Sequence, residues 1–203
     1  RGFGRSDRRL IDAYLRLESS PSLHLGAGNH ELDGWLNSSL YPVSSASIHV
    51  DATRPFPLDD DTFRYAFSNH MIEHLSYAAG ERMLKECFRV LEPGGTLRVS
   101  TPDFAFLLRI YANPMDPLTD HYIDWQLDWI NRENPRAAPT KAAIFVVNNF
   151  VRDWGHLFIY DRPILQHAMQ EAGFVDITDC ASNRSTHEKL CGIEHEERAP
   201  QGF

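Results

Sequence analysis

The stretch Ser22–His30 (SLHLGAGNH) predicts a short buried strand that runs into a glycine turn. Leu23 and Leu25 supply the apolar strand positions, and Gly26 and Gly28 leave the backbone without side chains. Glycine lets a main chain turn sharply and lie directly against a ligand. In open α/β sheets, ligands bind at the carboxyl ends of the strands, where such a turn lies. Gly-x-Gly also occurs in many ordinary turns, so the rest of the chain decides what this stretch does.

Outward from this turn, apolar runs alternate with amphipathic helical periods. The alternation predicts an α/β fold with a mainly parallel sheet. The last two predicted strands are joined only by residues 180–188, too short for a helical crossover, so we expect them to be antiparallel neighbours. The predicted strands are 22–25, 33–40, 46–51, 63–68, 96–100, 174–179 and 189–194, and the predicted helices are 5–17, 78–91 and 164–172.

Two segments depart from the regular alternation. Only about half a dozen residues separate Gly28 from Trp35, whereas a parallel crossover normally needs about a dozen or more. The first crossover helix is therefore expected to be a single turn or absent. Residues 104–153, with aromatic residues among prolines and charges, predict a mostly helical insertion after the fifth strand.

Composition narrows the class of protein. The chain has 203 residues, which suggests one domain, and its net charge of −8 argues against a nucleic-acid partner. No apolar run is long enough to cross a membrane, and no apolar core follows the basic residues 1–9 as it would in a signal peptide. The three cysteines show no CxxC spacing. We expect a cytoplasmic protein with reduced thiols.

Several ordered motifs resemble those of class I SAM-dependent methyltransferases. The most telling is RVLEPGGTL at 89–97, between a predicted helix and strand, and the others are LHLGAG at 23–28, VDA at 50–52, SNHMIEHL at 68–75 and GHLFIYD at 155–161. The pattern LHLGAG followed by GWLN at 34–37 is similar to a bacterial subgroup of predicted methyltransferases. The resemblance covers residues 23–194 apart from the insertion. It implies a single Rossmann-like, SAM-binding domain over 1–203, with seven strands and an antiparallel last strand, and with residues 104–153 as an insertion or lid.

The resemblance also implies which residues hold S-adenosyl-L-methionine (SAM). The carboxylate of Asp51 suits the adenine amine, although the same side chain is also suited to capping the turn before Thr53. In the subgroup the second strand usually ends in an acid that binds the ribose, whereas here Ser39 takes that place. The implied cofactor residues are Gly26, Ala27, Gly28, Asn29, Ser39, Asp51, Ala52, Asn69 and His70.

Methyl transfer needs an aligned nucleophile more than acid–base help, but a base is useful when the acceptor is a hydroxyl. The candidate catalytic residues are His70, His74 and His156, with Glu73 and Asp103 behind them. The alternative for His74 is a packing or capping role, and for His156 it is fixing the insertion to the core. The spacing of His70 and His74 suits a metal on one helical face, but no third ligand occurs at a telling spacing, so no metal is predicted.

The predicted function is methylation of a small-molecule acceptor that resembles a sugar or a secondary metabolite. The insertion, with Tyr111, Trp125 and Trp129, is suited to choosing that acceptor. Two alternatives stay open: a SAM-binding fold used for other chemistry, such as cyclisation or elimination, and a non-catalytic scaffold. An NAD-dependent dehydrogenase is disfavoured because position 31 is Glu31 rather than the third glycine of its fingerprint. The expected partner is a small molecule, with no nucleic acid or membrane, and a homodimer stays open.

Overall fold

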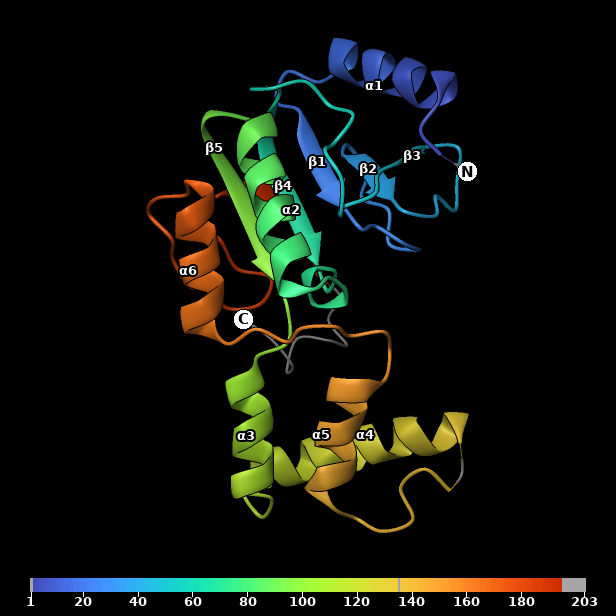
Figure 1. Ribbon diagram of the computed structural model, residues 1–203, viewed down its shortest axis with the longest axis vertical. Helices are drawn as coiled ribbons and strands as arrows, with labels where there is room; N and C mark the ends of the chain where they lie inside the picture. Colours follow the sequence, from blue (N-terminus) through green and yellow to red (C-terminus); the bar gives the residue numbers. More distant parts are fainter. Residues whose placement is uncertain (1, 135, 195–203) are drawn as a thin grey trace.

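The computed structural model describes residues 2–134 and 136–194, which form a sheet flanked by helices and a separate group of three helices (Figure 1). The sheet has the strand order β3-β2-β1-β4-β5, and every neighbouring pair is parallel. The parallel α/β sheet predicted from the sequence is therefore confirmed. Its strands are β1 (Ser22–Leu25), β2 (Leu36–Ser39), β3 (Ser47–His49), β4 (Phe63–Asn69) and β5 (Leu91–Ser100).

The prediction of seven strands with an antiparallel last strand is wrong. In the described part of the chain, residues 174–179 contain no strand, and the 3-10 helix η2 (Glu188–Leu190) lies within the other predicted strand. Val175, which the apolar pattern assigns to a strand, is 79% exposed. Further along, the chain closes on itself: Asn183 N donates to Glu194 Oε2 at 3.0 Å, and Glu194 N donates to Asn183 Oδ1 at 2.8 Å. A loop closed in this way does not run along the edge of β5 as a strand.

No helix lies between Gly28 and Trp35, as the short spacing predicts. A loop alone makes the crossover from β1 to β2. One strand residue fixes this loop: Asn37 Nδ2 donates to Leu32 O at 3.0 Å, and Asn37 Oδ1 accepts from Leu32 N at 2.9 Å. Because both backbone groups of Leu32 are satisfied by this side chain, the crossover is ordered without a helix.

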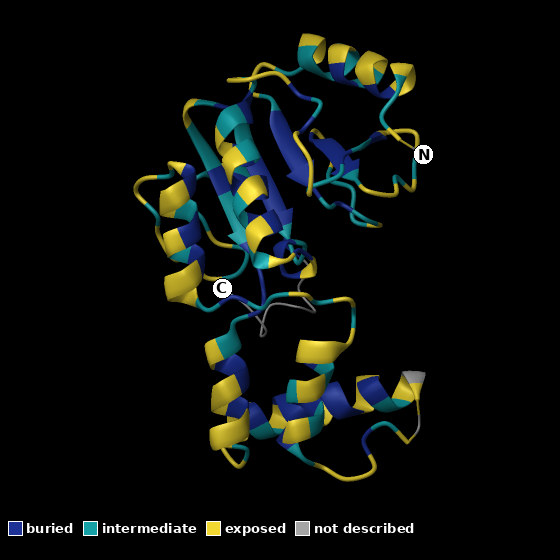
Figure 2. Ribbon diagram, viewed as in Figure 1, coloured by how far each residue is buried: buried dark blue, intermediate teal, exposed yellow. Residues whose placement is uncertain are grey.

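One face of the sheet packs against α2 (Tyr77–Val90) and α6 (Arg162–Ala172), which also contact each other (Figure 1). The main core lies here and includes fully buried Leu23 of β1. Figure 2 shows that most residues of β1 and β2 are buried. The two helices differ from the predicted ranges by at most two residues at either end. At the far edge, α1 (Arg5–Leu17) packs beside β3.

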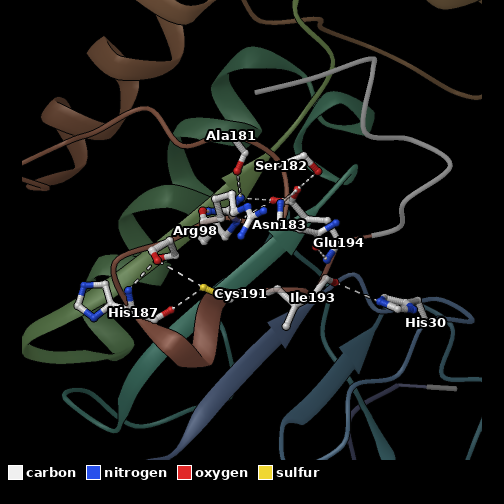
Figure 3. Close-up of polar contacts among 11 residues, drawn as sticks. His30, Arg98, Ala181, Ser182, Asn183, His187, Cys191, Ile193 and Glu194 are labelled. Atoms are coloured by element: carbon white, nitrogen blue, oxygen red, sulfur yellow. Dashed lines mark hydrogen bonds and ion pairs between the residues drawn. The ribbon is translucent and has the colours of Figure 1, made fainter.

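The other face of the sheet is covered by residues 180–194, which we call the C-terminal segment. Leu190 and Ile193 of this segment pack with Phe67 of β4 in a second, smaller core. Arg98 of β5 holds the segment in place, because its Nε donates to Glu194 Oε1 at 2.7 Å and its guanidinium also reaches carbonyl oxygens of the segment (Figure 3). A loop segment therefore replaces helices on this face.

The helices α3 (Phe104–Ala112), α4 (Pro117–Glu133) and α5 (Ala143–Arg152) lie between β5 and α6 in the chain. They pack around their own core, with Leu107, Ile110 and Val146 among its most buried members. Figure 1 shows this helical group beyond the arrowheads of β4 and β5, so it lies at the carboxyl end of the sheet. Among the described residues, no helix combines the length and the apolar character needed to cross a membrane.

Candidate active site

The candidate active site lies where β1 and β4 end. From β1 the chain moves outward to β2 and β3, and it then returns to the other side of β1 as β4. The carboxyl ends of the strands at such a switch point are where ligands bind in open α/β sheets. The glycine turn after β1, the residues after β4 and the helical group all lie at this end (Figure 1).

The two glycines of the turn have different surroundings. Both have left-handed backbones, with φ of 71° at Gly26 and 54° at Gly28. A Cβ on Gly26 would lie 2.9 Å from Met71 Cβ and would overlap Met71 Cγ. A Cβ on Gly28 would meet only the carbonyl oxygen of Gly26, at 4.0 Å. The space beside Gly26 is thus filled by Met71, and Gly28 is the glycine with open space beside its backbone.

The turn is held by the sheet and by the C-terminal segment rather than by a following helix. Ala27 N donates to Ser38 O at 2.9 Å, and His30 N donates to Ala27 O at 2.8 Å. The His30 ring then donates from Nε2 to the carbonyl oxygen of Ile193 at 3.2 Å (Figure 3). Asn29 is exposed. The backbone N–H of Ala27 therefore already donates its hydrogen bond within the protein.

Ser39, the last residue of β2, and Asp51, shortly after β3, use their polar atoms locally. Ser39 Oγ accepts from the backbone N–H two residues further on at 3.2 Å. Asp51 Oδ1 accepts from Thr53 Oγ1 at 2.7 Å and from Thr53 N at 2.9 Å, and these bonds lower the pKa of Asp51. Asp51 is therefore a charged turn cap, one of its two predicted roles. Ala52 beside it packs against the main core.

His70 follows β4 and is paired with a buried carboxylate. Its φ of 47° is left-handed, a strained conformation for a residue with a side chain, and such positions cluster at active sites. His70 Nδ1 lies 3.2 Å from Glu73 Oε1, and Thr101 Oγ1 donates to Glu73 Oε2 at 3.1 Å. Burial alone raises the pKa of Glu73, but the hydrogen bond and charge of His70 outweigh it, so the pKa is lowered. The carboxylate holds the proton on His70 Nδ1 and leaves Nε2 as the basic atom.

His74 and His156 are brought together by the fold. Their ring centroids lie 4.9 Å apart, edge to face. His156 Nδ1 donates to the carbonyl oxygen of Phe150 at 2.7 Å, and burial lowers the pKa of the His156 ring. The backbone next to His156 is fixed as well, because Leu157 N donates to Glu73 O at 2.8 Å. The three predicted catalytic histidines thus surround Glu73, whereas Asp103 caps α3 through Ala105 N.

Two residues of the site were not predicted from the sequence. Thr101 follows β5 directly and reaches Glu73 because β4 and β5 are neighbours, with Asn69 opposite Ser100. Because Thr101 directly follows a predicted strand, its position in the sequence could have placed it at the carboxyl end of the sheet. Met71 gives no such signal, because its contact with Gly26 depends on the path of the chain after β4.

Residues 30–99 match the family described as a methyltransferase domain. This match covers about a third of the chain. The match agrees with the predicted class, a class I SAM-dependent methyltransferase that uses SAM as its cofactor. A comparison with curated proteins gave no match.

Solved structures of low sequence identity resemble parts of this chain. The PH0226 protein of Pyrococcus horikoshii is 20% identical over 53% of this chain and 60% of its own, with a TM-score of 0.41. A Haloferax volcanii protein in complex with the Trm112 methyltransferase activator is 15% identical over 83% of this chain and 68% of its own, with a TM-score of 0.48. A SAM-dependent methyltransferase of Thermotoga maritima is 18% identical over 84% of this chain and 74% of its own, with a TM-score of 0.45.

The residues present fit SAM at the switch point. Ser68 Oγ and Asn69 Oδ1, at the end of β4, are buried and have no hydrogen-bond partner in the described part of the chain. Leaving such an atom unsatisfied costs about 1–3 kcal/mol. SAM carries an amine and ribose hydroxyls that donate hydrogen bonds, and the backbone at Gly28 leaves room for a ligand.

Proposed function

We propose that this methyltransferase moves a methyl group to a hydroxyl oxygen of a small-molecule acceptor, of the sugar or secondary-metabolite class. The observation that carries the proposal is the pair formed by His70 and Glu73 at the end of β4. A base at this place is useful for a hydroxyl acceptor, because a hydroxyl must lose its proton to become a good nucleophile. The net charge of −8 favours such an acceptor over a nucleic acid.

When bound, SAM supplies an activated methyl group on its sulfonium. With the cofactor bound, His70 would take the proton of the acceptor hydroxyl at Nε2, and SAM would supply the methyl group to the acceptor oxygen. Glu73 stabilises the resulting imidazolium, because its buried carboxylate faces His70 Nδ1. Thr101 orients Glu73 through the other carboxylate oxygen.

For the cofactor, we assign Gly28 and Asn69 the principal holding roles. Gly28 offers an open backbone, and Asn69 offers a buried oxygen without a partner among the described residues. The turns at Ser39 and at Asp51–Ala52 are assigned to the ribose and the adenine. There the local hydrogen bonds of Ser39 and Asp51 must be shared with the ligand. Gly26, Ala27 and Asn29 shape the turn.

The helical group is assigned to acceptor selection, as a lid over the site. It connects to the site through His156, whose ring donates to the carbonyl oxygen of Phe150 in α5. Because His156 lies beside His74, a shift of α5 is transmitted to the residues after β4. The acceptor is therefore expected to contact both the histidines and the helical group.

The test measures binding and turnover separately. Purified protein is titrated with SAM and S-adenosylhomocysteine (SAH) by calorimetry, and SAH release from SAM is followed with simple sugars and phenols as acceptors. We expect His70→Ala to lower turnover by about 10²–10⁴-fold, the usual contribution of a general base, with little change in SAH affinity. His167→Ala is the matched control, because His167 is exposed on α6.

Equal turnover in His70→Ala and wild type would refute the assigned base. Absence of SAM and SAH binding would refute the proposal as a whole. Binding of SAM without SAH release from any acceptor would favour the alternative of a SAM-binding fold used for other chemistry or as a scaffold.

A further inference from the structure

Three side chains around the site form a group with the chemistry of a metal centre. One donor atom each from Glu73, His74 and His156 lie within 4.8 Å of one another. Two imidazoles and one carboxylate are a common ligand set for zinc and other divalent transition ions. The sequence showed only His70 and His74 at a suggestive spacing. The ligand His156 follows the helical group in the chain, so no local sequence spacing predicts that it lies beside Glu73 and His74.

His156 is prepared as a ligand by its hydrogen bond. A carbonyl oxygen only accepts, so the 2.7 Å contact with Phe150 O places the proton on His156 Nδ1 and leaves the lone pair on Nε2. Metal-binding histidines almost always donate their other ring N–H to a carbonyl or carboxylate in this way. The Phe150 and Trp154 rings lie 6.2 and 5.8 Å from the His156 ring and form an apolar wall.

Glu73 has the features of a ligating carboxylate. Its exposed fraction is 0%, and its oxygens are oriented by Thr101 and His70. Hydrogen bonds of this kind to a ligating carboxylate are typical around metal ions. A fully buried carboxylate also requires positive charge nearby, which a divalent ion supplies.

The positions of the ligands need only a small adjustment. Bonds of about 2.1 Å in tetrahedral geometry place neighbouring donors about 3.4 Å apart, closer than the 4.8 Å limit observed. Glu73 and His156 are held by hydrogen bonds, and the backbone between them is joined by Leu157 N to Glu73 O at 2.8 Å. Within residues 2–134 and 136–194 the His74 ring makes no hydrogen bond, so its rotation is the movement that closes the group.

We propose that Glu73, His74 and His156 bind a divalent transition-metal ion of the zinc and cobalt class. Three protein ligands leave a coordination position open, as in catalytic rather than structural zinc sites. An acceptor hydroxyl bound there is placed beside His70 and made more acidic by the ion. This assignment to the acceptor rests on the proposed function, whereas binding of the ion does not.

The test uses untagged, chelator-treated protein titrated with Co²⁺ and Zn²⁺. Co²⁺ binding is followed by its visible absorption and Zn²⁺ binding by calorimetry, neither of which requires turnover. We expect one equivalent to bind, with at least tenfold weaker binding in His74→Ala and in His156→Ala. His167→Ala, an exposed histidine on α6, should bind as wild type does. Circular dichroism checks that each variant is folded.

Three results would overturn the metal site. They are the absence of stoichiometric binding, binding that survives both His74→Ala and His156→Ala, and binding lost equally in His167→Ala. If His156→Ala does not fold, His74→Ala decides alone, because its ring is held by no hydrogen bond in the described chain. SAH affinity, measured on the same samples, distinguishes failure of the metal site from failure of the proposed function.

Discussion

Substituting Gly28 by alanine tests whether this glycine is required for the fold or for binding the cofactor. Gly192 is the matched control, because both glycines are left-handed, with φ of 54° and 67°. A Cβ on Gly28 meets no atom closer than 4.0 Å, and a Cβ on Gly192 meets none within 4 Å. The cost to the fold is therefore only that of the backbone conformation, about 1–2 kcal/mol in either variant.

The two variants should differ in SAH binding. In Gly28→Ala the new methyl group occupies the space that we assign to the cofactor, and we expect affinity to fall at least tenfold. At an SAH concentration of 100 times the wild-type dissociation constant, the stabilisation by the ligand would fall from about 2.7 to about 1.4 kcal/mol. In Gly192→Ala it should stay near 2.7 kcal/mol.

Calorimetry gives the dissociation constants, and urea denaturation with and without SAH gives the stabilisation. Equal SAH affinity in Gly28→Ala and wild type would refute the position assigned to the cofactor. So would an equal loss in both variants, since the effect would then come from backbone strain alone.

Three further predictions test other parts of the structure. Burial lowers the pKa of His24 to about 4 from 6.5, so the unfolded chain binds this proton first, and stability is lost as pH falls from 6.5 to 4. The loss amounts to about 3 kcal/mol, and His24→Phe should remove it in urea denaturation at pH 4.5 and 7. Gly80→Ala should destabilise by about 1–3 kcal/mol, because its Cβ overlaps the buried Tyr160 hydroxyl; Tyr160→Phe should restore much of the loss in melting temperature, and a lack of rescue would contradict the contact. Glu194→Gln should cost about 3–5 kcal/mol, because it leaves Arg98 buried without its counter-charge; faster proteolysis between residues 180 and 194 is the expected readout, and an unchanged cleavage rate would contradict it.

The sequence predicted the parts of the fold that local patterns encode. The helix ranges near α2 and α6 followed from apolar periodicity, and the missing first crossover helix followed from the distance between Gly28 and Trp35. The prediction of two C-terminal strands was wrong for a physical reason. An apolar alternation forms a strand only where a neighbouring strand is free to pair with it. Here the two hydrogen bonds between Asn183 and Glu194 close a loop instead, and this loop does not pair with β5.

The candidate site shows the same limit. His70 was predicted because it follows a strand, and Glu73 because it lies close by in the sequence. The meeting of His74 and His156 depends on how the chain returns from the helical group, and the role of Gly26 depends on where Met71 packs. Long-range contacts of this kind leave no local sequence signal.

The C-terminal segment also has a consequence for how the chain folds during synthesis. Phe67, about a third of the way along the chain, is covered on one side by Leu190 and Ile193, which leave the ribosome much later. Until then, one face of a sheet whose strands are already complete stays uncovered and open to contact with other nascent chains. Chaperones that shield apolar surface are therefore expected to hold this protein until its last core residues emerge, and slowing translation should lengthen that period.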